Sequence, residues 1–445
     1  MLKAAASHLA AGEAGPRQRE RFRWRWLALA AILAGVALRV WQYAANPSIW
    51  VDEAAIARNV LDRRPWQLFG SLDFGQVAPP GFLLGIKLSV ALLGPSEYAL
   101  RLVPFVAGIA SPALFFVVAR SVLRPVGAVV ATLMFSTAIP LIFFSSNLKQ
   151  YSSDIAVTLL VIAIAIRLPL QSLSRRSACG FALVSLPLLF CSQAAVFPIT
   201  VAGAVVLTDA LLTPRPDRLN RLALVASWAA AVVAAATYGS WTMAAVDNAY
   251  LHRFWAQAFM PREGSLAWLW ATAQNVFAGP PPALGAFDGS LHYPWPALFA
   301  ALLAIGAVAI LRRAPARGVA VAGPVVLALA AAAAQAYPVG TRVSLFLLPS
   351  LLLLVVAGAE CVGRLVVRRP LGEYAPALLV PLALATLAQQ PPPRAPEHLR
   401  PVMQYVSDRW KPGDALWVYY GAGQAFLYYA RLIPLEGDIR IGDCN

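Results

Sequence analysis

Long runs of apolar residues dominate the sequence. A helix needs roughly 20 mostly apolar residues to cross a bilayer. Two of the apolar segments, 177–192 and 194–212, are short and are also compatible with one kinked or re-entrant pair of helices. The pattern predicts an all-α polytopic membrane protein with about eleven transmembrane helices, in a range of roughly 10 to 13. The eleven predicted segments are 26–44, 101–120, 125–145, 153–170, 177–192, 194–212, 220–245, 294–312, 316–337, 342–365 and 372–388.

The remaining polar stretches fall mainly into three regions, 45–100, 246–293 and the tail 389–445. The first region contains a shorter apolar run, 81–94, which is bounded by Pro79-Pro80 and Pro95. Fourteen residues are too few for a span, so this run predicts a helix lying at the membrane interface. The tail opens with three prolines and continues with helix-like and strand-like segments, which predicts a small α/β unit.

Composition and charge agree with a membrane protein and set its orientation. The 445-residue chain is 59% hydrophobic and 13% charged, whereas a soluble domain is about 25% charged. With the N-terminus inside, the predicted cytoplasmic segments hold 20 Lys and Arg residues and six acids, so most of the net charge of +15 lies there. The charge therefore follows the positive-inside rule and does not indicate nucleic-acid binding. It predicts a cytoplasmic N-terminus (1–25), a transmembrane module (26–388) and an extracytoplasmic tail (389–445).

Candidate chemistry begins directly after the first predicted span. Asp52 and Glu53 form an adjacent carboxylate pair framed by apolar residues, and Arg58 follows them. Carboxylates beside a membrane surface are costly to place and often functional. We interpret the two residues as candidate catalytic acids. The alternative interpretation is that they are solvated acids of a loop.

Two further polar clusters fall on the same predicted membrane side. The turn before 153–170 holds Lys149, Gln150, Tyr151 and Asp154, although helix capping by the intervening serines is an alternative explanation of part of this pattern. Arg342 begins the span 342–365. An interfacial arginine often extends to lipid headgroups, but an arginine at a helix N-terminus also suits a phosphate. If the neighbouring helices pack together, these groups face one cavity at the outer interface.

The order of these motifs resembles the membrane glycosyltransferases of the C superfamily, and more closely the bacterial branch related to protein O-mannosyltransferases and the lipid A aminoarabinose transferase. The resemblance rests on Trp50-Val51-Asp52-Glu53-Ala54, Ala78-Pro79-Pro80-Gly81, 94–102, 148–154 and 337–342. In some relatives a lysine or histidine before the proline-rich segment binds the donor phosphate. That place here reads Gly75-Gln76-Val77-Ala78, so the cation is expected to come from Lys149, Arg101 or Arg342.

The resemblance implies an inverting hexosyl or pentosyl transferase in the bacterial inner membrane. The donor sugar would be carried on a polyprenyl phosphate, and the acceptor would be an envelope glycan, glycolipid or protein. Asp52 would act as base, with Glu53 and Asp154 as further catalytic candidates. Asp52 and Asp154 would also hold a divalent cation such as Mg or Mn, if one is used. The candidate substrate-binding residues are Lys149, Gln150, Tyr151, Arg342, Arg101 and Arg58.

Two other classes of protein remain compatible with the sequence. A polytopic transporter or lipid flippase would suit eleven helices, but transporters usually place their sites near the bilayer midplane, and here the centres of the predicted helices are nearly free of acids. A non-enzymatic assembly or sensor protein would leave Asp52 and Asp154 replaceable.

Overall fold

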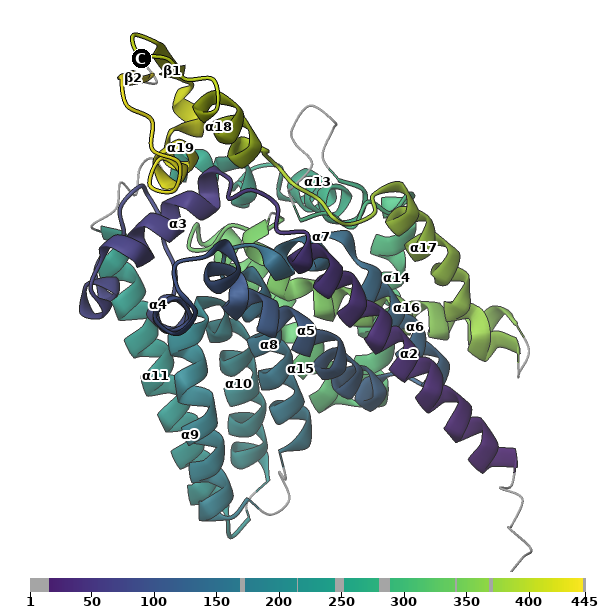
Figure 1. The fold of residues 1–445 in the computed structure, drawn as a ribbon. Helices are drawn as coiled ribbons and strands as arrows, with labels where there is room; N and C mark the ends of the chain where they lie inside the picture. The colour runs from purple at the N-terminus through teal and green to yellow at the C-terminus, as the bar shows by residue number, and fades with distance from the viewer. Residues whose placement is uncertain are drawn as a thin grey trace, which may run out of the picture.

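The computed structural model describes residues 16–168, 173–213, 215–244, 252–279, 289–340, 342–367 and 371–442. A helix coincides with every one of the eleven predicted spans (Figure 1). The unbroken ones are α2 (Pro16–Ala44), α5 (Glu97–Val122), α8 (Tyr151–Arg167), α9 (Arg175–Cys191), α10 (Val196–Leu212), α11 (Arg218–Ala244), α14 (Pro296–Arg313) and α15 (Pro315–Ala333).

The membrane class predicted from the sequence is confirmed. Among the described residues, eight helices are long and apolar enough to cross a membrane, or nine if a bent pair is counted as one span. Helices α8 and α9 have 17 residues each and fall just short in length. The count of eleven spans therefore remains a prediction.

The predicted span 125–145 is not one straight helix. It consists of α6 (Pro125–Thr137), α7 (Ile139–Phe143) and the short 3₁₀ helix η2 (Phe144–Ser146), with a bend of 58° between the two parts. Pro140 lacks the N–H that would bond the carbonyl four residues earlier, that of Ser136. Arg39 of α2, which is buried, donates to this carbonyl from Nη1 at 3.1 Å. A buried arginine in a spanning helix thus satisfies backbone that the bend exposes.

Proline also changes the start of two other predicted spans. The segment 342–365 begins as the 3₁₀ helix η6 (Arg342–Leu347) and continues as α16 (Leu348–Val366), with a proline in the first turn of α16. The segment 372–388 begins as η7 (Leu371–Leu379) and continues as α17 (Val380–Gln389). Pro349 and Pro381, in the first turns of α16 and α17, have no N–H to donate to the carbonyls four residues earlier, which lie in η6 and η7. The α-helical hydrogen-bond ladder is therefore interrupted at the leading turns.

Small residues allow the central helices to approach closely. A Cβ atom built on Gly306 of α14 would lie 1.8 Å from the backbone oxygen of Leu354, and one on Gly358 of α16 would lie 1.9 Å from that of Leu302. Such contacts between small residues are a typical basis of helix association in membranes. Of the candidate spans among the described residues, the one formed by η6 and α16 is the most enclosed, with 83% of its most apolar stretch buried.

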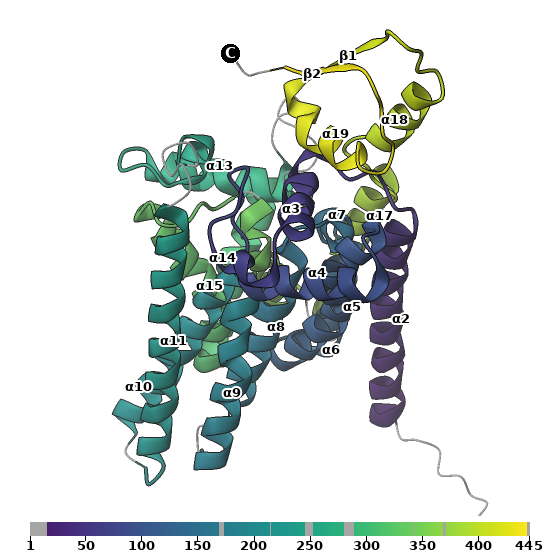
Figure 2. The same ribbon diagram turned by 60° about the vertical axis from the view of Figure 1, so that its left-hand side comes forward.

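Shorter helices lie at one end of the bundle, which we call the α3 end. Here lie α3 (Val51–Asp62), α4 (Pro80–Leu93), α13 (Ser265–Ala278) and the tail (Figures 1 and 2). Helix α4 is seen nearly along its axis in Figure 1 and from the side in Figure 2, so it runs across the long helices. Its Leu88 and Leu92 are 60% and 74% exposed, which suits the interfacial helix predicted for 81–94. The 3₁₀ helices η1 (Pro65–Phe69), η3 (Gln193–Ala195) and η4 (Ala256–Ala258) complete these connections.

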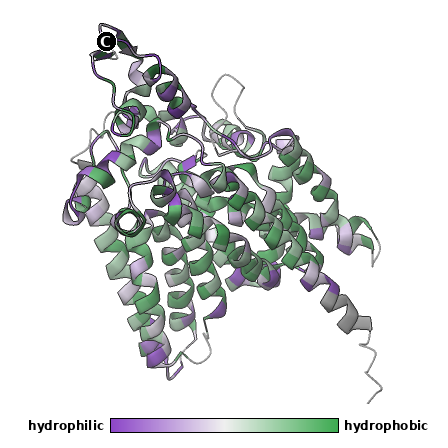
Figure 3. Ribbon diagram, in the orientation of Figure 1, coloured by the Kyte–Doolittle hydropathy of each residue, from purple (hydrophilic) through white to green (hydrophobic). Residues whose placement is uncertain are grey.

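Hydropathy follows this arrangement. Apolar residues cover the long helices, while polar residues gather toward their ends and around α3 and the tail (Figure 3). The N-terminal part of α2 lies at the opposite end from α3 (Figure 1). The three predicted polar clusters share the α3 end, since Arg342 is ion-paired with Asp52 of α3 and both charges act on Lys149.

The tail forms the small α/β unit predicted for it. It contains α18 (Leu399–Ser407), β1 (Ala415–Val418), the short η8 (Tyr420–Ala422), α19 (Gly423–Tyr429) and β2 (Asp438–Ile441). The two strands are parallel, with Ala415 opposite Asp438. Phe426 of α19 belongs to one apolar cluster with Ile56 and Val60 of α3, so the tail packs directly on α3.

Candidate active site

An ion pair joins two of the predicted site residues across 290 positions of sequence. Nη2 of Arg342, the first residue of η6, lies 2.7 Å from Oδ2 of Asp52, in the first turn of α3. Both side chains are about one-fifth exposed. The guanidinium lies over the rings of Trp50 and Trp255, at 5.7 and 5.9 Å from their centroids, and it hydrogen-bonds the phenol of Tyr151. The pair is thus accessible but framed by aromatic side chains.

Lys149 is the second cation of this site. Its side chain is 7% exposed, and Nζ donates to Oε1 of Gln76 at 2.6 Å. Burial lowers the pKa of Lys149 to about 8; the nearby Asp52 charge raises it and the Arg342 charge lowers it. Gln76 belongs to the segment Gly75-Gln76-Val77-Ala78, where the resemblance implies a phosphate-binding lysine or histidine in some relatives. The structure brings Lys149 to this place from another segment of the chain, a contact that the sequence did not reveal.

Several buried polar atoms around these residues have no hydrogen-bond partner in the described part of the chain. Among them are Nε1 of Trp50, Nε of Arg342, Oδ1 of Asn147 and Oε1 of Gln150, together with Oδ2 of Asp52, whose contact with Arg342 is an ion pair. The side-chain nitrogen of Gln150 contacts the Val77 carbonyl at 3.4 Å. An unpaired buried polar group costs about 1–3 kcal/mol. A cluster of such groups is typical of a place that binds a polar ligand or ordered water.

Glu53 faces away from Asp52 and pairs with Arg101 of α5. Nε and Nη2 of Arg101 donate to the two carboxylate oxygens of Glu53 at 2.8 and 2.5 Å, and the side chains are 2% and 0% exposed. Glu53 also accepts from the backbone N–H of Leu148 at 2.7 Å, while Arg101 donates to the carbonyl of Pro47 at 2.6 Å. The pair links α3, α5 and the Lys149 turn to one another.

The other predicted residues have separate environments. Asp154 is 5% exposed and accepts a hydrogen bond from Ser192 at 2.5 Å. Helix α8 begins at Tyr151 without a side-chain cap, and Ser152 donates to the Phe144 carbonyl, so the serine-capping alternative is wrong. Arg58 donates to Gln424 of α19 at 2.5 Å and lies 4.4 Å from the ring of Phe74. Thr341, beside Arg342, lies outside the described residues.

The tail holds the segment that carries Asp52. Arg394 and Gln42 exchange two hydrogen bonds of 2.8 Å, and the backbone N–H of Arg400 donates to Ser48 at 3.2 Å. Glu397 accepts a hydrogen bond from the backbone N–H of Val51. Burial, together with the charges of Asp52 and Glu53, raises the pKa of Glu397. These contacts were missed by sequence reasoning, because no local signal connects residues about 350 positions apart.

The predicted metal ligands do not form a donor set for Mg or Mn. Asp52 is paired with Arg342, and Asp154 accepts from Ser192. Within the described ranges, no group of three or more His, Cys, Asp or Glu side chains is placed to hold a metal ion.

Comparison with solved structures defines the class of fold. No protein-family model matches the sequence, and no curated protein matches it. The structure is similar to that of ArnT from Cupriavidus metallidurans bound to undecaprenyl phosphate, with a TM-score of 0.50 and 14% identity over 95% of this chain and 86% of that one.

Two archaeal structures are also similar. The Archaeoglobus fulgidus oligosaccharyltransferase in complex with Zn and sulfate gives a TM-score of 0.53 and 14% identity over 93% of this chain and 62% of that one. AglB from the same organism, in complex with an inhibitory peptide and a dolichol-phosphate, gives a TM-score of 0.52 and 12% identity over 91% of this chain and 64% of that one. The chain therefore shares the fold of ArnT and of the archaeal oligosaccharyltransferase, as the resemblance in its sequence implied.

Proposed function

We propose that the protein is a glycosyltransferase that moves a sugar from a polyprenyl-phosphate donor to an envelope acceptor. The observation that carries this proposal is the accessible Asp52–Arg342 ion pair with Lys149 beside it. It places a carboxylate and two cations together at one end of a membrane bundle. The solved structures of the same fold with undecaprenyl phosphate and dolichol-phosphate support a lipid-phosphate ligand. The α3 end would face the periplasm in a bacterial inner membrane.

In this mechanism Asp52 is the base. The attacking acceptor hydroxyl must lose its proton as its oxygen bonds to the anomeric carbon, and a carboxylate within hydrogen-bond reach can take it. The present pairing with Arg342 would open when the donor binds, because the lipid phosphate takes over the guanidinium. Asp52 is then free for the acceptor, and attack opposite the leaving phosphate gives inversion.

Arg342 and Lys149 bind the leaving phosphate. As the glycosidic C–O bond breaks, negative charge grows on the lipid phosphate, and preorganised cations stabilise it in a poorly hydrated site. Arg342 can contact two phosphate oxygens with its planar donors, and its buried Nε has no partner among the described residues. Lys149, held against Gln76, adds a point charge.

The buried Glu53–Arg101 pair has a positioning role in this proposal. Its contacts orient the start of α3 and the Lys149 turn, on which the base and one cation depend. Neither side chain needs to touch a substrate for that purpose. Glu397 completes the arrangement from the tail by bonding the N–H of Val51.

The test separates chemistry from donor binding. Asp52→Asn should lower transfer by roughly 100-fold or more but keep undecaprenyl-phosphate affinity, whereas Arg342→Met should weaken that affinity. Asp62→Asn, an exposed acid on the same helix, is the matched control. Purified variants in nanodiscs would be assayed for lipid-phosphate binding, and envelope glycans of complemented cells by mass spectrometry. Near-normal transfer by Asp52→Asn would overturn the assignment of the base, and lipid movement without transfer would favour a flippase.

A further inference from the structure

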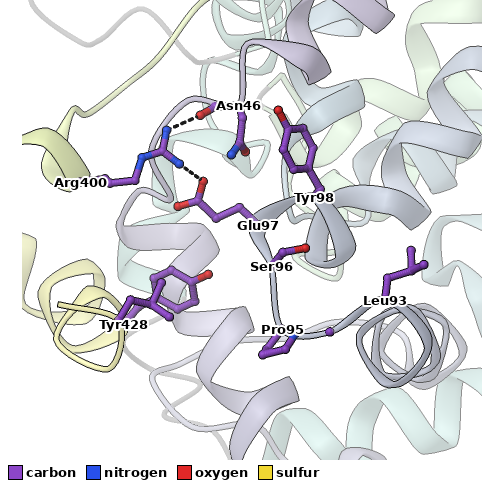
Figure 4. Close-up of a pocket in the computed structure, with 10 residues that line it drawn as sticks. Asn46, Leu93, Pro95, Ser96, Glu97, Tyr98, Arg400 and Tyr428 are labelled. Carbon is purple, nitrogen blue, oxygen red and sulfur yellow. Dashed lines mark hydrogen bonds and ion pairs between the residues drawn. The ribbon is translucent and has the colours of Figure 1, made fainter. Parts of the chain in front are cut away.

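A cleft of about 480 Å³ opens between the tail and the turn that joins α4 to α5 (Figure 4). The bundle contributes Asn46 and residues 93–98, and the tail contributes Arg400, Tyr428 and Leu432. The cleft borders the segment 46–51, which leads directly into α3 and Asp52.

The charges in this cleft neutralise one another. Nη1 of Arg400 donates to Oε2 of Glu97 at 2.5 Å, and the hydroxyl of Tyr429 donates to the other carboxylate oxygen at 2.5 Å. Nη2 of Arg400 is held by the Asn46 carbonyl at 2.8 Å. Neither an anionic nor a cationic ligand would find an uncompensated charge here, so the walls favour an uncharged, hydrogen-bonding one.

Tyr428 supplies a hydrogen-bonding group that the protein itself does not use. Its side chain is 2% exposed, and its hydroxyl has no hydrogen-bond partner in the described part of the chain. Figure 4 shows this hydroxyl turned across the cleft toward Ser96. Buried tyrosine hydroxyls usually have a partner, so a ligand hydroxyl at this position would satisfy a group that is otherwise left unpaired.

The mouth of the cleft lies at the level of the interfacial helix. Leu93, at the end of α4, is 61% exposed, and Tyr98 is 41% exposed. An aromatic ring and aliphatic carbons suit the apolar faces of a sugar ring, and the exposed leucines of α4 suit an adjoining acyl chain. The cleft thus combines uncharged polar contacts inside with lipid-compatible side chains at its edge.

We propose that this cleft binds the uncharged, hydroxyl-bearing sugar headgroup of a membrane-anchored glycolipid. Its role as the acceptor subsite rests on the proposed function, whereas the binding itself does not. The ligand enters from the lipid surface beside α4 and donates to or accepts from Tyr428. Its bound position lies next to the segment that carries Asp52.

The test uses octyl β-D-glucopyranoside below its micellar concentration as a probe, with the full chain in nanodiscs and ligand-observed NMR as the readout. Tyr428→Phe should weaken probe affinity roughly 5-fold, the scale of one neutral hydrogen bond. It should not lower the unfolding temperature, because the lost hydroxyl has no protein partner. Tyr429→Phe, its neighbour, loses bonds to Glu97 and to the Ile49 N–H and should lower that temperature.

Three outcomes would overturn the proposal. They are no saturable binding by the wild type, equal probe affinity in Tyr428→Phe, and an octyl phosphate affinity that matches that of the glycoside and falls in Tyr428→Phe, which would contradict an uncharged ligand. Free glucose binding as tightly as the octyl glycoside would overturn the lipid-borne source. Undecaprenyl-phosphate affinity is measured on the same samples: its absence in the wild type would count against the proposed function and leave the glycoside result intact.

Discussion

Replacing Glu53 by glutamine tests whether the start of α3 depends on the buried ion pair. Glutamine keeps the size of the side chain but removes the charge, so the guanidinium of Arg101 is left buried without its counter-ion. Breaking such a pair from one side costs about 3–5 kcal/mol. Arg101 keeps its bonds to the carbonyls of Pro47 and Ser48 and to Asn46, so we expect the lower end, about 3 kcal/mol.

Amide hydrogen exchange of residues 46–62 would measure this loss locally, because it reports the free energy of opening each segment. A loss of about 3 kcal/mol corresponds to a roughly 150-fold faster exchange. Asp62→Asn is the matched control on the same helix. Its pair with Arg431 is 2.7 Å long but exposed, at 48% and 39% of the two side chains, and such pairs contribute at most about 1 kcal/mol.

The two variants should therefore differ by well over one order of magnitude in exchange rate. We also expect Glu53→Gln to reduce transfer through misplacement of Asp52, while undecaprenyl phosphate still binds to Arg342. Exchange in Glu53→Gln no faster than in Asp62→Asn would refute the reasoning, since it would show that α3 is held without the Glu53–Arg101 pair.

Two further predictions concern the lysine and the bundle. Lys149 is cationic only below its pKa, which burial lowers to about 8, so undecaprenyl-phosphate affinity should fall as pH rises from 7 through 8 to 9.5. The Lys149→Met variant should flatten this pH profile of affinity. An unchanged profile in that variant would contradict the assignment of Lys149 as a phosphate-binding cation. Gly306→Ala should lower thermal stability by roughly 1–3 kcal/mol, because its Cβ meets the Leu354 oxygen at 1.8 Å. Gly180→Ala, in α9 with nothing within 4 Å of the added Cβ, should stabilise by up to about 1 kcal/mol in the same melting assay.

The proposed site draws on segments far apart in the chain. Asp52 comes from α3, Lys149 from the turn before α8, and Arg342 from the 3₁₀ turn before α16. Arg342 lies in the 3₁₀ helix η6 itself, and the bend at Pro140 precedes the Lys149 turn in the chain. Irregular backbone at a membrane protein's active end is tolerated where the protein itself surrounds it.

The sequence by itself determined the membrane class and the residues that gather at one end. Apolar runs of about 20 residues leave little choice but spanning helices, and the order of those runs put Asp52, Lys149 and Arg342 on one predicted side. The structure confirms the class and joins Asp52 to Arg342. The sidedness itself remains a prediction from the distribution of arginine and lysine.

Only the tertiary structure separated the roles of two adjacent acids. Successive residues of a helix point about 100° apart, so Asp52 meets Arg342 while Glu53 meets Arg101, and no pattern in the sequence shows which acid faces which cation. The same holds for the contact of Lys149 with Gln76 and of Glu397 with Val51. Local patterns fix the helices and their apolar faces, but partners separated by 48 residues, as in the Glu53–Arg101 pair, or by about 350 meet only because those helices pack in one particular way.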